Sequence, residues 1–204
     1  MPTDRRAEKQ WTRAQHAYEH YQKYISTKED RCRLSFVDLI FIKNFKGGSA
    51  TITEPVASLD GKLKPYEEAL RRLDGSKLFS EKNLGTIDEK DYTRVRNVIV
   101  AFAAMPEVPE YDISGFGSSF ASALLHFYFP NIVPILDKRA INGCGIQGLN
   151  VDASNNVTNL LELYPDLVDQ FRERLRENPR LSLRELDYHF FSQELRTPPF
   201  KGKN

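Results

Sequence analysis

Residues 113–125 read ISGFGSSFASALL, and residues 134–137 read PILD. Gly115 and Gly117 predict a tight Gly-x-Gly turn, because glycine adopts positive φ angles at no steric cost. Apolar residues at helical spacing follow this turn and predict an amphipathic helix. Asp137 closes a short apolar run twenty residues after the second glycine. The two segments therefore predict a helical fold that brings one carboxylate to the end of a buried connection.

The rest of the chain shows the same helical periodicity, so we expect an all-α protein. Capping-box patterns at residues 86–89 and 182–185 predict two helix starts, and Gly47-Gly48 predicts a helix end. A loop is expected over residues 49–62, and a mobile tail from Thr197. The expected helices cover residues 4–25, 31–45, 63–73, 86–104, 118–129, 155–164 and 165–178, with two more that begin at residue 137 or 138 and at residue 182.

Composition indicates an ordinary globular protein. The chain has 204 residues, of which 40% are hydrophobic and 28% charged. Its first residues are polar and lack the apolar run of a signal peptide, and the longest apolar run, residues 98–105, is too short to cross a bilayer. The 2 cysteines are too few for a disulfide framework or a four-cysteine metal cluster. We therefore expect a cytoplasmic protein that does not bind membranes.

The net charge of +1 excludes a strongly basic nucleic-acid-binding protein. A nearly neutral chain can still bind DNA if its positive charges gather on one face. Any one of these charges is as well explained as a solvated surface residue. The basic residues that we consider for such a face are Lys43, Lys46, Lys138, Arg139, Lys201 and Lys203.

The Gly-x-Gly turn is suited to holding a DNA phosphate. The first N–H groups of the following helix, at residues 118–120, lack partners within the helix and point along the positive end of its dipole. Such contacts fix the position of the protein on DNA without reading the sequence. Most Gly-x-Gly turns are only turns, and Asp137 has the simple alternative role of a helix N-cap.

The joint spacing of the turn and the aspartate resembles the helix-hairpin-helix DNA glycosylase superfamily, which includes endonuclease III and the adenine mismatch glycosylases. The hairpin of that family reads roughly Leu-Pro-Gly-Val-Gly-x-x-Thr-Ala, and an apolar run later ends in the catalytic aspartate. The resemblance covers about residues 113–141. The matching residues are Gly115, Phe116 and Gly117 in the turn, Ala121, Leu124 and Leu125 in the helix, and Pro134, Ile135, Leu136 and Asp137 in the catalytic segment.

The chain departs from the family pattern at several positions. Ser114 replaces the common proline, and Phe120 replaces the common threonine. Ser119 stands where bifunctional members carry the lysine that forms a Schiff base. Lys138 lies next to Asp137, but its spacing does not argue for that role. The resemblance therefore implies base removal without strand cleavage, and no iron–sulfur cluster.

The resemblance implies a monofunctional DNA glycosylase that acts on a damaged or modified base in double-stranded DNA. The base must first leave the helical stack. Asp137 would then stabilise the oxocarbenium-like transition state, orient the attacking water, or do both. The implied fold has two lobes around a central cleft, and the protein is expected to be a monomer. One lobe spans residues 29–136 and ends in the hairpin, and the other combines residues 1–28 with residues 137–204.

The same resemblance implies the other residues of the site. Lys43, Asn44 and Phe45 are the candidates for the base pocket, or for the wedge that fills the gap left in the DNA. Trp11, Tyr18 and Tyr21 are further aromatic candidates, although such a stripe is more often core packing. A monovalent cation on the backbone of Ile113, Gly115 and Gly117 is the one cofactor implied. The DNA-binding candidates are Gly115, Phe116, Gly117, Ser118, Ser119, Lys138 and Arg139.

Two other functions fit the same features. The scaffold could bind DNA without catalysis, as a recruitment factor or lesion sensor, or the hairpin could serve only to pack the fold. The sequence does not identify the target base. Oxidised, alkylated and mismatched bases are open, as are the bulky modified bases of phage genomes, so both repair and defence are open roles.

Overall fold

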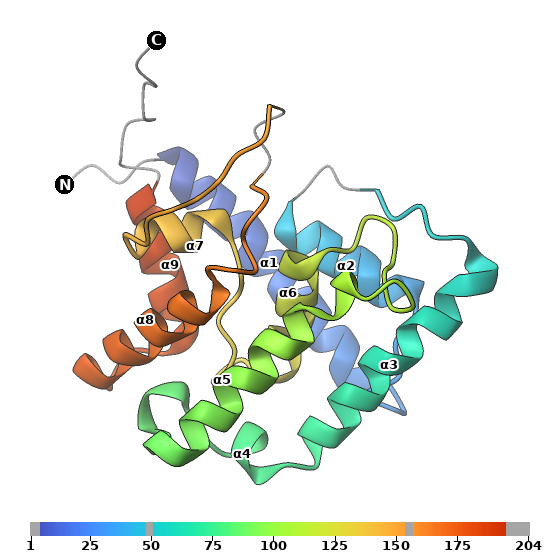
Figure 1. The fold of residues 1–204 in the computed structure, drawn as a ribbon, viewed down its shortest axis with the longest axis horizontal. Coiled ribbons are helices and arrows are strands. Elements are labelled where there is room, and N and C mark those ends of the chain that lie inside the picture. Colours follow the sequence, from blue (N-terminus) through green and yellow to red (C-terminus); the bar gives the residue numbers. More distant parts are fainter. Residues whose placement is uncertain (1–4, 48–50, 154–156, 195–204) are drawn as a thin grey trace.

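The computed structural model of this chain describes residues 5–47, 51–153 and 157–194. Within these ranges the chain is mostly helical and contains only isolated β-bridges, which confirms the all-α class (Figure 1). In chain order the helices are α1 (Arg5–Thr27), α2 (Phe36–Lys46), α3 (Val56–Asp74), α4 (Lys77–Ser80), α5 (Glu89–Ala103), α6 (Ser118–Tyr128), α7 (Lys138–Gly143), α8 (Tyr164–Glu177) and α9 (Leu183–Glu194), with 3₁₀ turns η1 (Leu84–Thr86) and η2 (Met105–Glu107).

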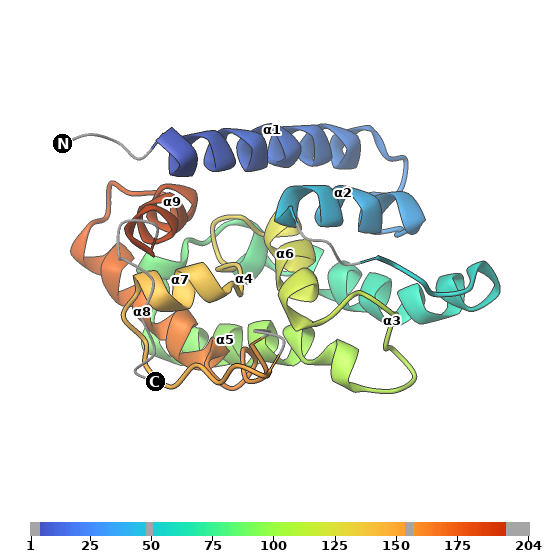
Figure 2. The same cartoon turned by 90° about the horizontal axis from the view of Figure 1, so that it is seen from above.

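Helix α1 runs along one side of the molecule, over α9 at its N-terminal end and over α2 at its C-terminal end (Figure 2). Helix α6 lies in the centre and packs against α1, α2, α3 and α5. Helix α7 packs most closely against α9. A Cβ atom at Gly143 would lie 2.3 Å from the Phe190 carbonyl oxygen, so α7 and α9 can approach this closely only because residue 143 is glycine.

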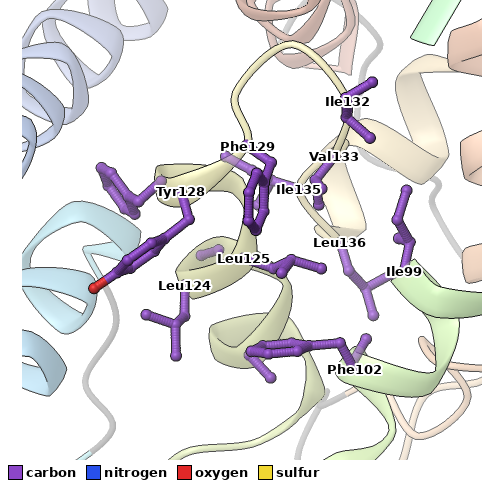
Figure 3. Packing of buried hydrophobic residues seen from close by; sticks show 14 of the residues in the cluster. Ile99, Phe102, Leu124, Leu125, Tyr128, Phe129, Ile132, Val133, Ile135 and Leu136 are labelled. Atoms are coloured by element: carbon purple, nitrogen blue, oxygen red, sulfur yellow. The ribbon is translucent and has the colours of Figure 1, made fainter. Parts of the chain in front are cut away.

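The core is densest around α6 and the segment that follows it. Every residue from Ala121 to Tyr128 is buried. Ile132, Val133 and Leu136 are also fully buried, and Figure 3 shows Leu136 beside Ile99 of α5. The burial of this segment explains why an uninterrupted apolar sequence leads up to Asp137.

Two helix starts differ from the sequence-based expectation. Helix α2 begins at Phe36, because the Ser35 N–H and hydroxyl both donate to the Asp38 carboxylate at 2.8 and 3.0 Å. Helix α5 is capped by Asp88, which accepts from the Asp91 N–H at 2.9 Å, so the expected start at residue 86 is wrong. The capping box expected at residues 182–185 is confirmed by reciprocal hydrogen bonds.

Two further expectations were wrong. Helix α3 begins at Val56 and contains Pro65, so residues 56–62 are helical rather than part of a loop. Residues 157–163 form turns instead of a helix, because Asn159 exchanges hydrogen bonds with the backbone of Asn150 and Gly148. The expected positions 155–156 and the tail with Lys201 and Lys203 lie outside the described residues.

Among the described residues, no helix is both long and apolar enough to cross a membrane.

Candidate active site

Asp137 is held at the end of a segment that α6 and α8 fix in place. The Ser119 hydroxyl donates to the Leu136 carbonyl at 2.7 Å, and the Leu136 N–H donates to the Ser122 hydroxyl at 2.9 Å. The Tyr164 hydroxyl donates to the Pro134 carbonyl at 2.6 Å. The N–H and the carbonyl of Leu136, the residue before Asp137, are therefore both hydrogen-bonded. This fixes the backbone there and limits the positions that the Asp137 carboxylate can occupy.

Asp137 caps α7, as the simpler interpretation of the sequence predicts. Its Oδ1 accepts from the Arg139 N–H at 2.8 Å. This bond uses one carboxylate oxygen. The cap role therefore does not exclude a chemical role for the other oxygen.

The second carboxylate oxygen contacts a lysine from a distant part of the chain. Lys46 Nζ lies 2.7 Å from Asp137 Oδ2 and 3.3 Å from the Leu136 carbonyl. The Lys46 side chain is 9% exposed, whereas the Asp137 side chain is 35% exposed. Burial of the Asp137 carboxyl acts to raise its pKa, but the Lys46 ammonium and the Arg139 N–H together hold that pKa below its usual value. Asp137 is thus an ionised carboxylate at neutral pH.

A cavity of about 620 Å³ opens beside this ion pair. Its walls come from α1, the end of α2, the start of α7, and α9. Two of the three residues expected in the base pocket, Asn44 and Phe45, line this cavity together with Trp11, whereas Lys43 is not part of its lining. Tyr21 is fully buried in the core, as expected for core packing. The structure therefore brings the catalytic candidate and two pocket candidates to one place.

Sequence reasoning missed three residues of this cavity. Lys46 appeared there only as a basic residue, and nothing in the local pattern shows that it contacts Asp137. Arg184 and Asp187 of α9 also line the cavity, and Arg184 Nη1 donates to Asp187 Oδ2 at 2.6 Å. Burial raises the pKa of Asp187, and the nearby Asp137 charge acts in the same direction. The cavity therefore holds two carboxyl groups whose pKa values are shifted in opposite directions.

The predicted Gly-x-Gly turn forms, and glycine is required at Gly115 for two reasons. Its φ is +87°, and the Phe116 N–H closes the turn onto the Ile113 carbonyl at 2.8 Å. A Cβ at Gly115 would lie 2.2 Å from the Thr51 carbonyl oxygen. The position that a side chain would occupy at Gly115 is thus filled by the backbone of Thr51 rather than open to solvent. The side chains of Ile113 and Phe116 are buried, so any DNA contact at these positions would involve the backbone.

Gly117 is the part of the hairpin that is open. It caps α6, it is exposed, and no atom lies within 4 Å of a Cβ placed there. Within the part of the chain that the structure describes, the Ser118 and Ser119 N–H groups have no acceptor. The Ser118 hydroxyl donates to the Glu107 carboxylate at 3.2 Å, and the Ser114 N–H of the turn donates to Glu54 at 3.2 Å. A phosphate at this helix end would have to displace Glu107.

The carbonyl groups expected to hold a cation are already used in part. The Ile113 carbonyl accepts from Phe116, and the Gly117 carbonyl accepts from the Phe120 and Ala121 N–H groups. Among the described residues, no three or more His, Cys, Asp or Glu side chains are placed to hold a metal ion. The cation site stays a prediction.

Substitution of the two hairpin glycines is expected to give unequal results. Gly115→Ala should lower the free energy of unfolding by about 2 kcal/mol or more, because alanine at positive φ is strained and its Cβ would overlap Thr51. Gly117→Ala should lower it by about 1 kcal/mol or less, the cost of replacing glycine by alanine at a helix N-cap without any overlap. Urea unfolding followed by circular dichroism measures both. Equal losses of stability would contradict the assignment of Gly115 to packing.

Comparison with known proteins gives no match: no family model, no curated protein and no solved structure matches this chain.

Proposed function

We propose that this protein is a monofunctional DNA glycosylase, which hydrolyses the N-glycosidic bond of a damaged or modified base in double-stranded DNA. The observation that carries the proposal is the position of Asp137. An ionised, partly exposed carboxylate stands on the wall of a cavity of about 620 Å³, and its backbone is held by the helix that follows the hairpin.

The chemistry requires a negative charge close to C1′ of the sugar. As the bond between C1′ and the base nitrogen breaks, the electron pair leaves with the base and positive charge builds on the sugar. The Asp137 carboxylate stabilises that charge and can orient the water that adds to C1′. The water adds its oxygen to C1′ and loses a proton, and the departing base nitrogen takes up a proton, so the products are a neutral free base and an abasic site.

The cavity supports the binding of a flipped base. Its volume lies in the range typical of small-molecule sites. Trp11 and Phe45 make part of its wall aromatic, and exposed Asn44 is the wedge candidate. We propose that this cavity is the cleft between the two lobes, residues 29–136 and residues 1–28 with 137–204.

DNA would approach on the side of the hairpin. Gly117 and the free N–H groups of Ser118 and Ser119 would hold a phosphate next to the flipped nucleotide. Arg139 lines the cavity, and Lys138 precedes it at the start of α7. These two cations are the residues that would neutralise phosphates there.

The product should be an abasic site without a strand break. The Ser119 side chain carries no amine, and its hydroxyl is committed to the Leu136 carbonyl. Incubation with a panel of modified duplexes tests the proposal, because alkali cuts DNA at abasic sites. We expect strand cleavage at one class of modified base, and only after alkali. Uncut DNA across the whole panel would contradict the proposed activity, and cleavage before alkali would contradict its monofunctional character.

The ion pair between Lys46 and Asp137 favours a second candidate, a DNA-binding protein without catalytic activity. A carboxylate that is paired with an ammonium group offers less net charge to the sugar. This candidate predicts salt-dependent DNA binding with no base release. If the protein does not bind DNA at any salt concentration, this result would instead favour a hairpin that only packs the fold.

A further inference from the structure

Helix α1 separates its basic and acidic residues onto two sides. One side carries basic and imidazole side chains at the i, i+4, i+7, i+11 and i+14 spacing of a single helix face. This basic row consists of five exposed residues, Lys9, Arg13, His16, His20 and Lys23. The acidic residues of the helix, Glu8 and Glu19, lie on the other flank, where Glu19 accepts from the Gln15 side chain at 3.0 Å.

The basic row lies at the opening of the cavity that contains Asp137. Arg13, His16 and His20 line this cavity, and because they are exposed they lie where it meets solvent. Neither Glu8 nor Glu19 belongs to the lining. The facing walls come from α7 and α9, and α1 runs along one side of these two helices (Figure 2). The row therefore forms the α1 edge of the opening through which a nucleotide would enter.

The protein does not neutralise this row. Among the residues that the structure describes, no carboxylate forms an ion pair with any of its side chains, although most arginines of α8 and α9 are paired. Four cationic side chains line the cavity against two carboxylates. Both carboxylates are already paired, Asp137 with Lys46 and Asp187 with Arg184. An exposed row of unpaired positive charge beside a positive cavity attracts an anionic partner.

The length of the row suits the phosphate backbone of a nucleic acid. From Lys9 to Lys23 the row extends about 21 Å, at about 1.5 Å per residue. One strand of B-DNA carries a phosphate every 3.4 Å or so along its axis, so the row covers a distance of about six phosphates. Lysine and arginine are the main side chains that contact phosphates in protein–DNA complexes.

We propose that the basic row of α1 is a second DNA-binding surface, which holds the phosphate backbone on the α1 side of the cavity while the hairpin holds it on the other side. This inference rests on the proposed function, because it names further contacts of the same site with its substrate. Contacts to phosphates do not read bases, so the row contributes affinity and position rather than the choice of base.

The first test measures how the affinity of the full-length protein for an unmodified duplex depends on salt concentration. Each phosphate contact that is lost should lower the slope of log K against log salt by about 1. The triple variant Lys9→Gln, Arg13→Gln, Lys23→Gln should therefore lower this slope by about 2 to 3, and weaken binding about 10-fold or more at about 100 mM salt. The loss should be equal on duplexes of different sequence.

A second triple variant removes the same amount of charge elsewhere. Lys64→Gln, Lys77→Gln and Lys90→Gln replace exposed lysines of α3, α4 and α5, none of which lines the cavity. This variant should keep the wild-type slope to within about 0.5. Equal effects of the two triple variants would overturn the proposal, because the net charge alone would then explain the affinity.

The second test uses two neighbouring residues of α1. His16→Glu places a carboxylate in the basic row, whereas Gln15→Glu places one on the opposite flank, beside Glu19. Both variants lower the formal net charge by the same amount. His16→Glu should weaken duplex binding about 5-fold or more, and Gln15→Glu less than about 2-fold. Thermal unfolding followed by circular dichroism checks that each variant is folded. Equal weakening by the two variants would also overturn the proposal.

These binding measurements do not depend on base release, so they separate this inference from the proposed function. If the basic row controls duplex affinity but no modified base is released from any duplex, the glycosylase fails and the DNA-binding surface stands. If bases are released and the row variants bind and excise like wild-type protein, the basic-row assignment fails alone. If wild-type protein binds no duplex at any salt concentration, both fail, and binding to phosphatidylserine vesicles would then indicate that the row attracts a membrane surface.

Discussion

Asp137→Asn is expected to lower the rate of base excision by about 10²- to 10³-fold or more and to leave DNA affinity nearly unchanged. Asparagine keeps the shape of the side chain but removes the negative charge that stabilises the sugar in the transition state. Because asparagine caps helices as well as aspartate does, α7 should still form. Lys46 would keep an amide oxygen and the Leu136 carbonyl as acceptors. Single-turnover kinetics and a DNA-binding titration measure the two effects.

Asp88→Asn is the matched control for this substitution. Asp88 also caps a helix through its side chain, but it is exposed at the start of α5 and does not line the cavity. Its replacement should leave excision unchanged. Equal excision rates for wild-type protein and Asp137→Asn would contradict the catalytic role and favour the binding protein.

Lys46→Met is expected to move the acid limb of the pH–rate profile to higher pH. In the wild-type protein, Lys46 helps to hold the pKa of Asp137 below its usual value. Without the ammonium group, burial raises the pKa of Asp137 with less opposition, so the carboxylate becomes protonated, and activity is lost, at a higher pH. At a pH well above the acid limbs of both proteins, the variant should excise the base at least as fast as the wild type, because its carboxylate is unpaired.

The same pair predicts the pH dependence of stability. The folded-state pKa of Asp137 is lowered, so the pair contributes stability above the usual pKa of an aspartate, and this contribution is lost as the pH falls through the lowered folded-state value.

Lys43→Met is the control for Lys46→Met, since Lys43 is on the same helix but does not line the cavity. If Lys46→Met does not change the pH of the acid limb, Lys46 does not control the pKa of the catalytic carboxylate. Strand cleavage that disappears in this variant would show that the Lys46 amine takes part in the chemistry.

The parts of the fold that the sequence predicts are those set by nearby residues. The start of α6 after Gly117, the cap of α7 by Asp137 and the capping box of α9 each depend on residues within about one helical turn. The start of helix α3 was predicted seven residues too late, and its internal Pro65 is typical of a helix start rather than an interior. Side-chain hydrogen bonds to a distant backbone segment replaced the helix expected at residues 155–164.

The candidate site was predicted only in part for the same physical reason. Asp137, Asn44 and Phe45 were found from local motifs and from the family resemblance. Lys46 reaches Asp137 across 91 residues, and the contact of Arg184 with Trp11 joins opposite ends of the chain. Such contacts depend on how helices pack, which no local pattern in a single sequence reveals. The close approach of Thr51 to Gly115 belongs to the same class.

The most direct test of the central claim is to measure the free base released from a modified duplex, by mass spectrometry, for wild-type protein and Asp137→Asn in parallel. Wild-type protein should release base and abasic DNA in equal amounts, and the variant should bind the same duplex but release almost no base. If both proteins bind the DNA and neither releases a base, or if both release it at the same rate, Asp137 is not the catalytic group of a glycosylase.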